Sequence, residues 1–277
     1  LKWAYKLSAE NIFSEEEKIR LLKEILEHID AEIEVDDEKD FLEGITGEIS
    51  CIKNNQLDIK EFRSVYCPPN IFREIYYTYE RERNRRKKLD FDDMLVLCHE
   101  LFTKRPDILK KWQERYSYIL IDEFQDINKV QYDVIHMLAL PQNNLFIVGD
   151  DDQSIYKFRG ARPEIMLGFE KDYPNAKKVL LDVNYRSTKA IVNGARKIIQ
   201  KNKNRYVKNI ITSNEQGADI HIQEVRNLSE ESIYVLNEIR EELKRGVPAS
   251  EIAVLFRTNM EPRMLAETFM EYNLPFQ

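Results

Sequence analysis

The chain has 277 residues, of which 43% are hydrophobic and 33% are charged. This length predicts two or three domains, each with a real hydrophobic core. The 42 basic and 49 acidic side chains give a formal net charge of -7. A simple basic nucleic-acid binder is therefore excluded at the level of the whole chain, whereas a local basic groove is still allowed.

The cysteines and the apolar runs predict the environment of the protein. Cys51, Cys67 and Cys98 lie outside any CxxC or histidine-paired spacing, so no zinc site is expected. A sparse and odd number of cysteines is typical of a reducing compartment, and we expect a cytoplasmic protein. No apolar run approaches the roughly 20 residues of a membrane span, so no membrane association is expected. Because the chain begins with Leu1 rather than Met, we expect an internal part of a longer protein.

Residues 1–116 have a helical pattern almost throughout. Ser14 is followed three residues later by Glu17, which is a capping box at the start of a helix that carries apolar residues through Ile29. Pro68 and Pro69 mark a break and a new start, since proline is tolerated in the first turn of a helix. Further helices are expected over residues 71–89, 91–102 and 106–116, which together predict a helical subdomain over residues 1–116.

The pattern changes at Tyr118 to that of a parallel α/β sheet. Three short apolar runs each stop abruptly at polar residues, namely Asp122, Gly149-Asp150 and Asp182. Buried strands that end in polar loops, with helices between them, are typical of parallel sheets, whose ligands sit at the carboxyl ends of the strands. Strands are therefore expected over residues 118–121, 145–148 and 179–181, within a domain part that covers 117–182.

A second α/β unit is expected over residues 183–277. The pattern predicts a helix over 188–203, a strand over 219–225 and a helix over 229–244 that Gly246 and Pro248 close. A strand over 252–256 and a last helix over 261–272 follow.

The acidic segment that follows the first strand is the first candidate site. Asp122 and Glu123 are adjacent carboxylates at a strand end. In such a pair one carboxylate holds a hydrated Mg²⁺ and the other polarises the water that attacks a phosphate. The alternative at this point is an acidic loop that caps the next helix.

A second candidate site follows the next strand, over residues 149–161. Gly149 allows a sharp turn at the strand end, and Gln153 is a neutral side chain that donates to and accepts from a phosphate–water assembly. Tyr156 and Phe158 alternate with basic residues, a pattern that suits single-stranded nucleic acid. The alternative is a surface loop with buried aromatic rings.

A third candidate segment, Asn184-Tyr185-Arg186-Ser187, lies between the two α/β units and supplies an arginine. Residues 89–93, 122–126, 149–161, 184–188 and 254–259 form five motifs in order and in register. Together these motifs resemble the UvrD/Rep/PcrA group of superfamily-one DNA helicases, over essentially the whole chain.

The resemblance implies roles in ATP hydrolysis. Asp122 resembles the acid that associates with Mg²⁺, and Glu123 resembles the base that activates water. Gln153 resembles the γ-phosphate sensor, and Gln125 would link the nucleotide to the neighbouring motifs. In the second unit, Arg186 resembles an arginine finger supplied in cis, and Tyr185 would stack on the adenine.

The resemblance also implies contacts with single-stranded and duplex DNA. Tyr156, Phe158 and Arg159 resemble the segment that stacks on a single strand, and Arg257 and Asn259 resemble backbone and base contacts. Two residues depart from the family pattern: Phe158 stands where tryptophan is common, and Ile127 stands where threonine is usual.

The resemblance implies incomplete RecA-like (P-loop NTPase-type) parallel-sheet domains with a helical insertion subdomain. The implied activity is ATP-driven translocation on single-stranded DNA with duplex unwinding, with ATP and Mg²⁺ as cofactors. No Gly-Lys pair occurs in the sequence, so no P-loop is present, and the late motifs of the second motor domain are absent too. We therefore expect the chain to be an inactive fragment whose uncovered sheet self-associates or rearranges.

Three alternatives remain at this point. One is the helicase subunit of a nuclease-helicase complex. Another is a DNA-binding or scaffold module without ATPase activity, which the missing P-loop favours for this chain. The third is a metal-dependent phosphohydrolase that uses Asp122, Glu123, Asp150 and Asp152, which explains the acids but neither the aromatic segment nor the Asn-Tyr-Arg-Ser motif.

Overall fold

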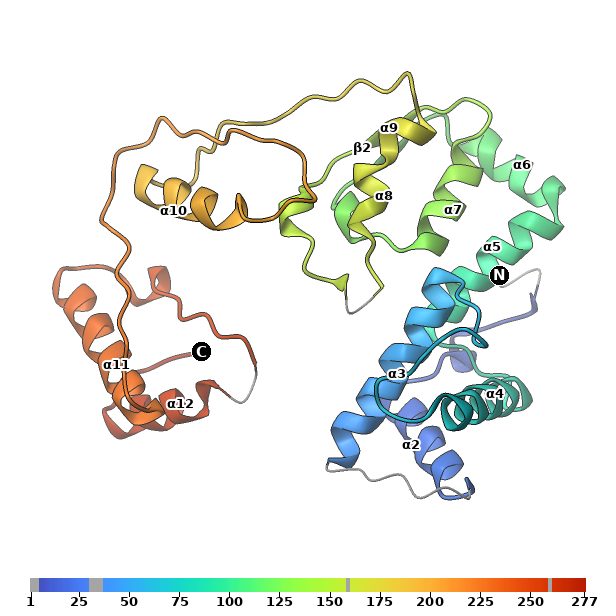
Figure 1. Ribbon diagram of the computed structural model, residues 1–277, viewed down its shortest axis with the longest axis horizontal. Helices are drawn as coiled ribbons and strands as arrows, with labels where there is room; N and C mark the ends of the chain where they lie inside the picture. Colours follow the sequence, from blue (N-terminus) through green and yellow to red (C-terminus); the bar gives the residue numbers. More distant parts are fainter. Residues whose placement is uncertain (1–4, 30–36, 158–159, 259–260) are drawn as a thin grey trace. The chain divides into compact units, whose positions relative to one another are not determined.

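The computed structural model describes residues 5–29, 37–157, 160–258 and 261–277 (Figure 1). They form two compact units. The first comprises Leu1–Val183 and Arg196–Ile210, and the second comprises Asn184–Ala195 and Ile211–Gln277. The chain therefore passes into the second unit at residue 184, returns to the first for residues 196–210, and leaves it again. The division at residues 116 and 182 stays a prediction.

The first half of the first unit is helical, as predicted. Ser14 Oγ accepts a hydrogen bond from the Glu17 N–H at 3.1 Å, and Glu17 Oε2 accepts one from the Ser14 N–H at 2.9 Å, which confirms the capping box. Pro69 lies in the first turn of its helix, also as predicted. The helices are α2 (Glu15–Leu26), α3 (Glu38–Asn55), α4 (Pro69–Arg85), α5 (Phe91–Lys104) and α6 (Pro106–Arg115).

Apolar side chains at helical spacing join α2, α3 and α4 into one core. The core residues include Leu21 and Leu22 from α2, and all of them are nearly or fully excluded from solvent. Because these helices bury their apolar stripes against one another, this part is stabilised locally. Other buried side chains of this core include Phe41, Leu42, Ile45, Phe72, Ile75 and Tyr79.

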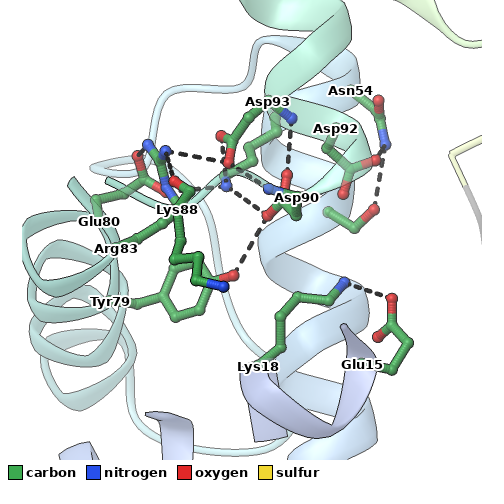
Figure 2. Close-up of polar contacts among 12 residues, drawn as sticks. Glu15, Lys18, Asn54, Tyr79, Glu80, Arg83, Lys88, Asp90, Asp92 and Asp93 are labelled. Atoms are coloured by element: carbon green, nitrogen blue, oxygen red, sulfur yellow. Dashed lines mark hydrogen bonds and ion pairs between the residues drawn. The ribbon is translucent and has the colours of Figure 1, made fainter. Parts of the chain in front are cut away.

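A buried ionic cluster fastens α3 and α4 to the start of α5 (Figure 2). Lys53 Nζ lies 2.8 Å from Asp90 Oδ2, 2.9 Å from Asp93 Oδ1 and 2.9 Å from Glu80 Oε1. Arg83 adds contacts of 3.1 Å to Asp93 and 2.7 Å to Glu80. Two cations thus face three carboxylates in a place where water is largely excluded.

The buried environment shifts the pKa values of Asp90 and Asp93 in opposite directions. Asp90 is the N-cap of α5 and forms a capping box with Asp93. Burial opposes the ionisation of Asp90, but the Lys53 ammonium outweighs it and lowers the pKa to about 2. Burial raises the pKa of Asp93 to about 6 despite Lys53, and the Asp90 carboxylate adds to the increase. Asp93 is therefore the carboxyl of the pair that takes up a proton first as the pH falls.

A second polar chain connects the helices to the α/β part of the same unit. Asn54, which is 3% exposed, donates from Nδ2 to Asp92 Oδ1 at 2.7 Å. Its Oδ1 accepts a hydrogen bond from Asn128 Nδ2 at 3.0 Å. Asn128 is in turn the N-cap of α7 (Lys129–Ala139), where it forms a capping box with Gln131.

The α/β part contains a small parallel sheet. β1 (Ile119–Ile121) pairs with β2 (Leu145–Ile147), with Leu120 opposite Phe146. One face packs on a core of Phe124, Ile127 and Phe169, together with α8 (Pro163–Leu167) and α9 (Phe169–Asp172). The other face is open, since Leu120 is 71% and Phe146 is 60% exposed, and both line a hollow of about 470 Å³.

The sheet is smaller than predicted. Residues 179–181, 219–225 and 252–256 contain no strand, although each run is apolar or alternating. Leu181, Ile222 and Leu255 are 84%, 93% and 92% exposed, and no residue of these runs is fully buried, although Ile252 and Val254 are half-buried. A strand is stabilised by pairing and by packing against a neighbour, and an apolar run by itself supplies neither. The prediction of these three strands was wrong for this structure.

The second unit is built around two helices that pack together. α11 (Leu228–Lys244) begins at Asn227, whose Oδ1 accepts a hydrogen bond from the Glu230 N–H at 2.9 Å. It ends before Gly246, whose φ of 92° suits a glycine at a helix end. α11 packs on α12 (Pro262–Glu271). The predicted helix over 188–203 is α10 (Lys189–Ile199), which passes from the second unit into the first.

Among the described helices, none combines the length and the apolar character that crossing a membrane requires.

Candidate functional site

The acidic motif forms a tight turn at the carboxyl end of β1. Asp122 and Glu123 are exposed, and Asp122 Oδ1 accepts a hydrogen bond from the Glu123 N–H at 2.9 Å. Glu123 has φ 52° and ψ 40°, a left-handed conformation that non-glycine residues adopt rarely. The turn presents both carboxylates to solvent. An exposed carboxylate of this kind suits Mg²⁺, which keeps several of its waters and binds proteins through one or two carboxylates.

Gln125 links this turn to the loop that follows β2. Its side chain is 1% exposed, donates from Nε2 to Glu123 Oε2 at 2.8 Å and accepts the Asp150 N–H at Oε1 at 3.0 Å. A Cβ atom on Gly149 would lie 2.5 Å from Gln125 Oε1 and 3.1 Å from the Phe124 backbone nitrogen. The glycine is therefore required for the two loops to approach each other.

The loop after β2 holds Gln153 beside Asp150. Asp150 Oδ2 accepts a hydrogen bond from Gln153 Nε2 at 2.8 Å, while the Gln153 side chain is otherwise exposed. A single polar chain thus runs from Glu123 through Gln125 and Asp150 to Gln153. The structure brings these four predicted motif residues together at the carboxyl ends of two adjacent parallel strands, where ligands of such sheets bind.

Two basic residues that the sequence reasoning missed complete this loop. Lys208 Nζ lies within 2.5 Å of Asp150 Oδ1, 2.5 Å of Asp151 Oδ1 and 2.9 Å of Asp152 Oδ2. Arg205 forms a two-pronged contact with Asp152, at 2.7 Å and 2.5 Å. The available sequence signal was a group of basic residues between 201 and 208.

The three consecutive aspartates are close enough to hold a metal ion, with ligand atoms within 4.8 Å of one another. The Lys208 ammonium occupies the position that a cation would take among these carboxylates. This arrangement argues against the phosphohydrolase alternative, which needs Asp150 and Asp152 as metal ligands.

The expected DNA-stacking segment is only partly described. Tyr156 is 38% exposed, whereas Phe158 and Arg159 lie outside the described residues. The end of the segment is fixed: Gly160 has φ 88° and is buried, and the Arg162 N–H donates to the Ile127 carbonyl oxygen at 2.9 Å. Ile127 is 8% exposed and belongs to the core with Phe124, so an apolar residue fits this position better than a hydroxyl.

The remaining predicted residues belong to the second unit. Asn184 Oδ1 accepts the Arg186 N–H at 3.0 Å and the Ser187 N–H at 2.8 Å, which fixes a turn from which the Tyr185 and Arg186 side chains project into solvent. Arg257 is exposed as well, and Asn259 lies outside the described residues.

Comparison with known proteins gives these motifs a family. A model of the UvrD/REP helicase N-terminal domain matches residues 3–174, and a model of the UvrD-like helicase C-terminal domain matches residues 179–277. The chain belongs to the UvrD/Rep helicase family. This confirms the resemblance, and the family implies a RecA-like fold around the observed two-stranded sheet.

Relatives in this helicase family come from several bacteria. The chain is 45% identical over 205 residues to a putative ATP-dependent DNA helicase YjcD of Bacillus subtilis, covering 73% of this chain and 27% of that protein. It is 42% identical over 202 residues to the ATP-dependent DNA helicase PcrA of Staphylococcus aureus, covering 73% and 28%. A PcrA of Staphylococcus epidermidis is 40% identical over 237 residues, covering 83% and 32%. The chain thus spans about a third or less of these UvrD/Rep helicases.

Proposed function

We propose that this chain supplies part of the ATP-hydrolysing and single-strand-binding machinery of an ATP-dependent DNA helicase that translocates on single-stranded DNA and unwinds duplex DNA. The observation that carries the proposal is the chain of hydrogen bonds from Glu123 through Gln125 and Asp150 to Gln153. These hydrogen bonds hold a carboxylate and a neutral amide at the carboxyl ends of β1 and β2. Phosphoryl transfer to water requires such positioned groups for the water and the phosphate.

In the proposed mechanism, Glu123 accepts the proton of the attacking water, and its carboxylate is held in place by the Gln125 side chain. Gln153 donates a hydrogen bond to the γ-phosphate, since its Nε2 is already directed by Asp150. Asp122 is the residue that would hold Mg²⁺, which when bound neutralises charge on the phosphate oxygens.

The second unit would contribute Arg186 and Tyr185. Both side chains are exposed on a turn that Asn184 fixes, so an arginine finger and an adenine-stacking ring are available to a nucleotide. We assign the contacts with single-stranded DNA to Tyr156, Phe158 and Arg159, and to Arg257 and Asn259. The three unpaired cysteines support a reducing, cytoplasmic location.

The proposal is tested by Glu123→Gln in the full native protein that carries this chain. The substitution keeps the shape and the acceptor for Gln125, and it removes the base. We expect DNA-stimulated ATP hydrolysis to fall by about 10²–10⁴-fold, with binding of ATP and of a dT oligonucleotide retained. Glu114→Gln, at an exposed carboxylate of α6, is the matched control and should leave the rate unchanged.

A rate for Glu123→Gln close to that of the native protein would reduce Glu123 to a turn residue and contradict the proposal. For the 277-residue chain alone, we expect no appreciable ATP hydrolysis, because it contains no Gly-Lys pair to cradle the phosphates. Single-strand binding by a native protein that hydrolyses no ATP would favour the DNA-binding scaffold instead.

A further inference from the structure

Residues Arg196–Ile210, here called the strap, belong to the first unit although the residues before and after them belong to the second. The strap is fastened where it carries charge. Arg205 and Lys208, whose side chains are each 11% exposed, contact Asp150, Asp151 and Asp152. The Tyr206 N–H adds a hydrogen bond to Asp151 Oδ2 at 2.9 Å. All three consecutive carboxylates are thus held by one short piece of chain.

Without these contacts, the three carboxylates of this loop would repel one another. The ligand atoms of Asp150, Asp151 and Asp152 lie within 4.8 Å of one another, so three like charges meet in a partly buried place. The contacts of Lys208 and the fork of Arg205 neutralise these charges with strong, charge-assisted hydrogen bonds. The Lys208 hydrogen bond lowers the pKa of Asp150 against the effect of burial, which keeps the pair ionised at neutral pH.

Asp150 connects Lys208 to Gln153. One oxygen of Asp150 accepts from Lys208, and the other accepts from Gln153 Nε2 at 2.8 Å. The Asp150 N–H donates to Gln125, which in turn holds Glu123. Lys208 is therefore linked through one residue, Asp150, both to the proposed phosphate sensor Gln153 and to Gln125, which orients the proposed base.

We propose that Arg205 and Lys208 are positioning residues: they fix the loop 150–153, and with it Gln153, in the geometry that senses the γ-phosphate. The inference rests on the proposed ATPase function for its catalytic consequence, and on the contacts alone for the fixing of the loop. Because the strap continues at both ends into the unit that carries Tyr185 and Arg186, the sensor loop is anchored by chain that leads directly to the proposed arginine finger.

The first test is amide hydrogen exchange of the 277-residue chain, which needs no ATP. Lys208→Met should raise the exchange rate of the loop amides at residues 150–154 by about tenfold or more. Lys208→Arg keeps the charge and should restore most of the protection. Lys203→Met, at an exposed lysine of the same strap, is the matched control and should leave the loop unchanged. Exchange of the Lys208→Met loop at the rate of the unaltered chain would overturn the proposal.

The second test changes Arg205 without altering the carboxylates that Lys208 also contacts. Arg205→Met should loosen the loop, and Arg205→Lys, which keeps a positive charge beside Asp152, should restore part of its protection. Exchange of the Arg205→Met loop at the rate of the unaltered chain, with far-UV circular dichroism also equal to that of the unaltered chain, would overturn the role of Arg205.

The third test measures the catalytic consequence in the full native protein. Lys208→Met should lower kcat for DNA-stimulated ATP hydrolysis by about 10²-fold, because misplacing a group by about 1 Å has an effect of that size, while KM for ATP changes little. An unchanged kcat together with a loosened loop would overturn the sensing role. A native protein without ATPase activity would instead remove the proposed function, and the exchange experiment would still decide whether the strap fixes the loop.

Discussion

Removal of the Lys53 ammonium should be among the most destabilising single changes in the helical part of the chain. The change is Lys53→Met, which keeps most of the length of the side chain and deletes its charge. It leaves Asp90 and Asp93 buried, at 3% and 5% exposure, without their shared cation. Breaking a buried ion pair by removing one partner costs about 3–5 kcal/mol. We expect a loss of that size in the free energy of unfolding at pH 7.

The loss should depend on pH with a definite sign. Without Lys53, burial places the folded-state pKa of both aspartates above the unfolded value of about 3.9. Such a group contributes stability that is complete below the unfolded pKa and is lost as the pH rises through the folded pKa. In the native chain Asp90 has a lowered pKa of about 2, so its contribution is present above about pH 4. The difference between variant and native chain should therefore shrink as the pH falls from 7 to 4.

Urea unfolding followed by far-UV circular dichroism measures both effects. Lys39→Met is the matched control, because Lys39 is 79% exposed and lies 3.8 Å from Glu43; its cost should stay within about 0.5 kcal/mol. Adding Asp90→Asn to Lys53→Met should recover part of the loss, since asparagine is still a good N-cap. A loss below about 1 kcal/mol at pH 7 would refute the reasoning, as would a loss that does not shrink in acid.

Three further outcomes test the caps, the loop contact and the open sheet face. Ser14→Ala removes a capping box and should lower the free energy of unfolding by about 1 kcal/mol in the same urea assay, whereas no change would mean that α2 needs no cap. Gly149→Ala introduces a Cβ atom 2.5 Å from Gln125 Oε1 and should cost about 1–3 kcal/mol, with protection of the Asp150 amide lost in hydrogen exchange. Phe146→Ser should weaken the self-association of the chain in sedimentation velocity, because it removes exposed apolar surface; a native chain that is monomeric at every concentration would contradict this expectation.

Local chemistry explains the elements that the sequence predicted well. Helix starts at Ser14 and Pro69 depend on residues within three or four positions of each other, so a linear pattern reveals them. The strands that end at Ile121 and Ile147 were also predictable, because each apolar run stops close to the point where the chain leaves the core. These same ends carry most of the candidate site, which explains why motif residues could be named in advance.

Long-range pairing explains what the sequence did not predict. The runs at 179–181 and 252–256 have strand-like composition, yet a strand also needs a neighbour, and composition does not specify one. Lys208 lies 58 positions after Asp150 and 57 positions after Asp151 in the sequence. No periodicity in the sequence predicts a contact over that separation. Lys53 and its partners Glu80 and Asp90 are likewise distant in the sequence and meet only in the folded chain.

The two ionic clusters of the first unit differ in a way that separates a structural role from a positioning role. Asp90 and Asp93 are almost wholly buried, so the Lys53 cluster is costly to open, and it joins α3 and α4 to the start of α5. The Asp150 side chain is 40% exposed, so its own contact with Lys208 opens at smaller cost, whereas Lys208 and Asp151 are 11% and 3% exposed and form the firmer contact. The Asp150 carboxylate also accepts a hydrogen bond from Gln153. Of the two clusters, the second is the one whose contacts reach the proposed site residues, so it suits a positioning role.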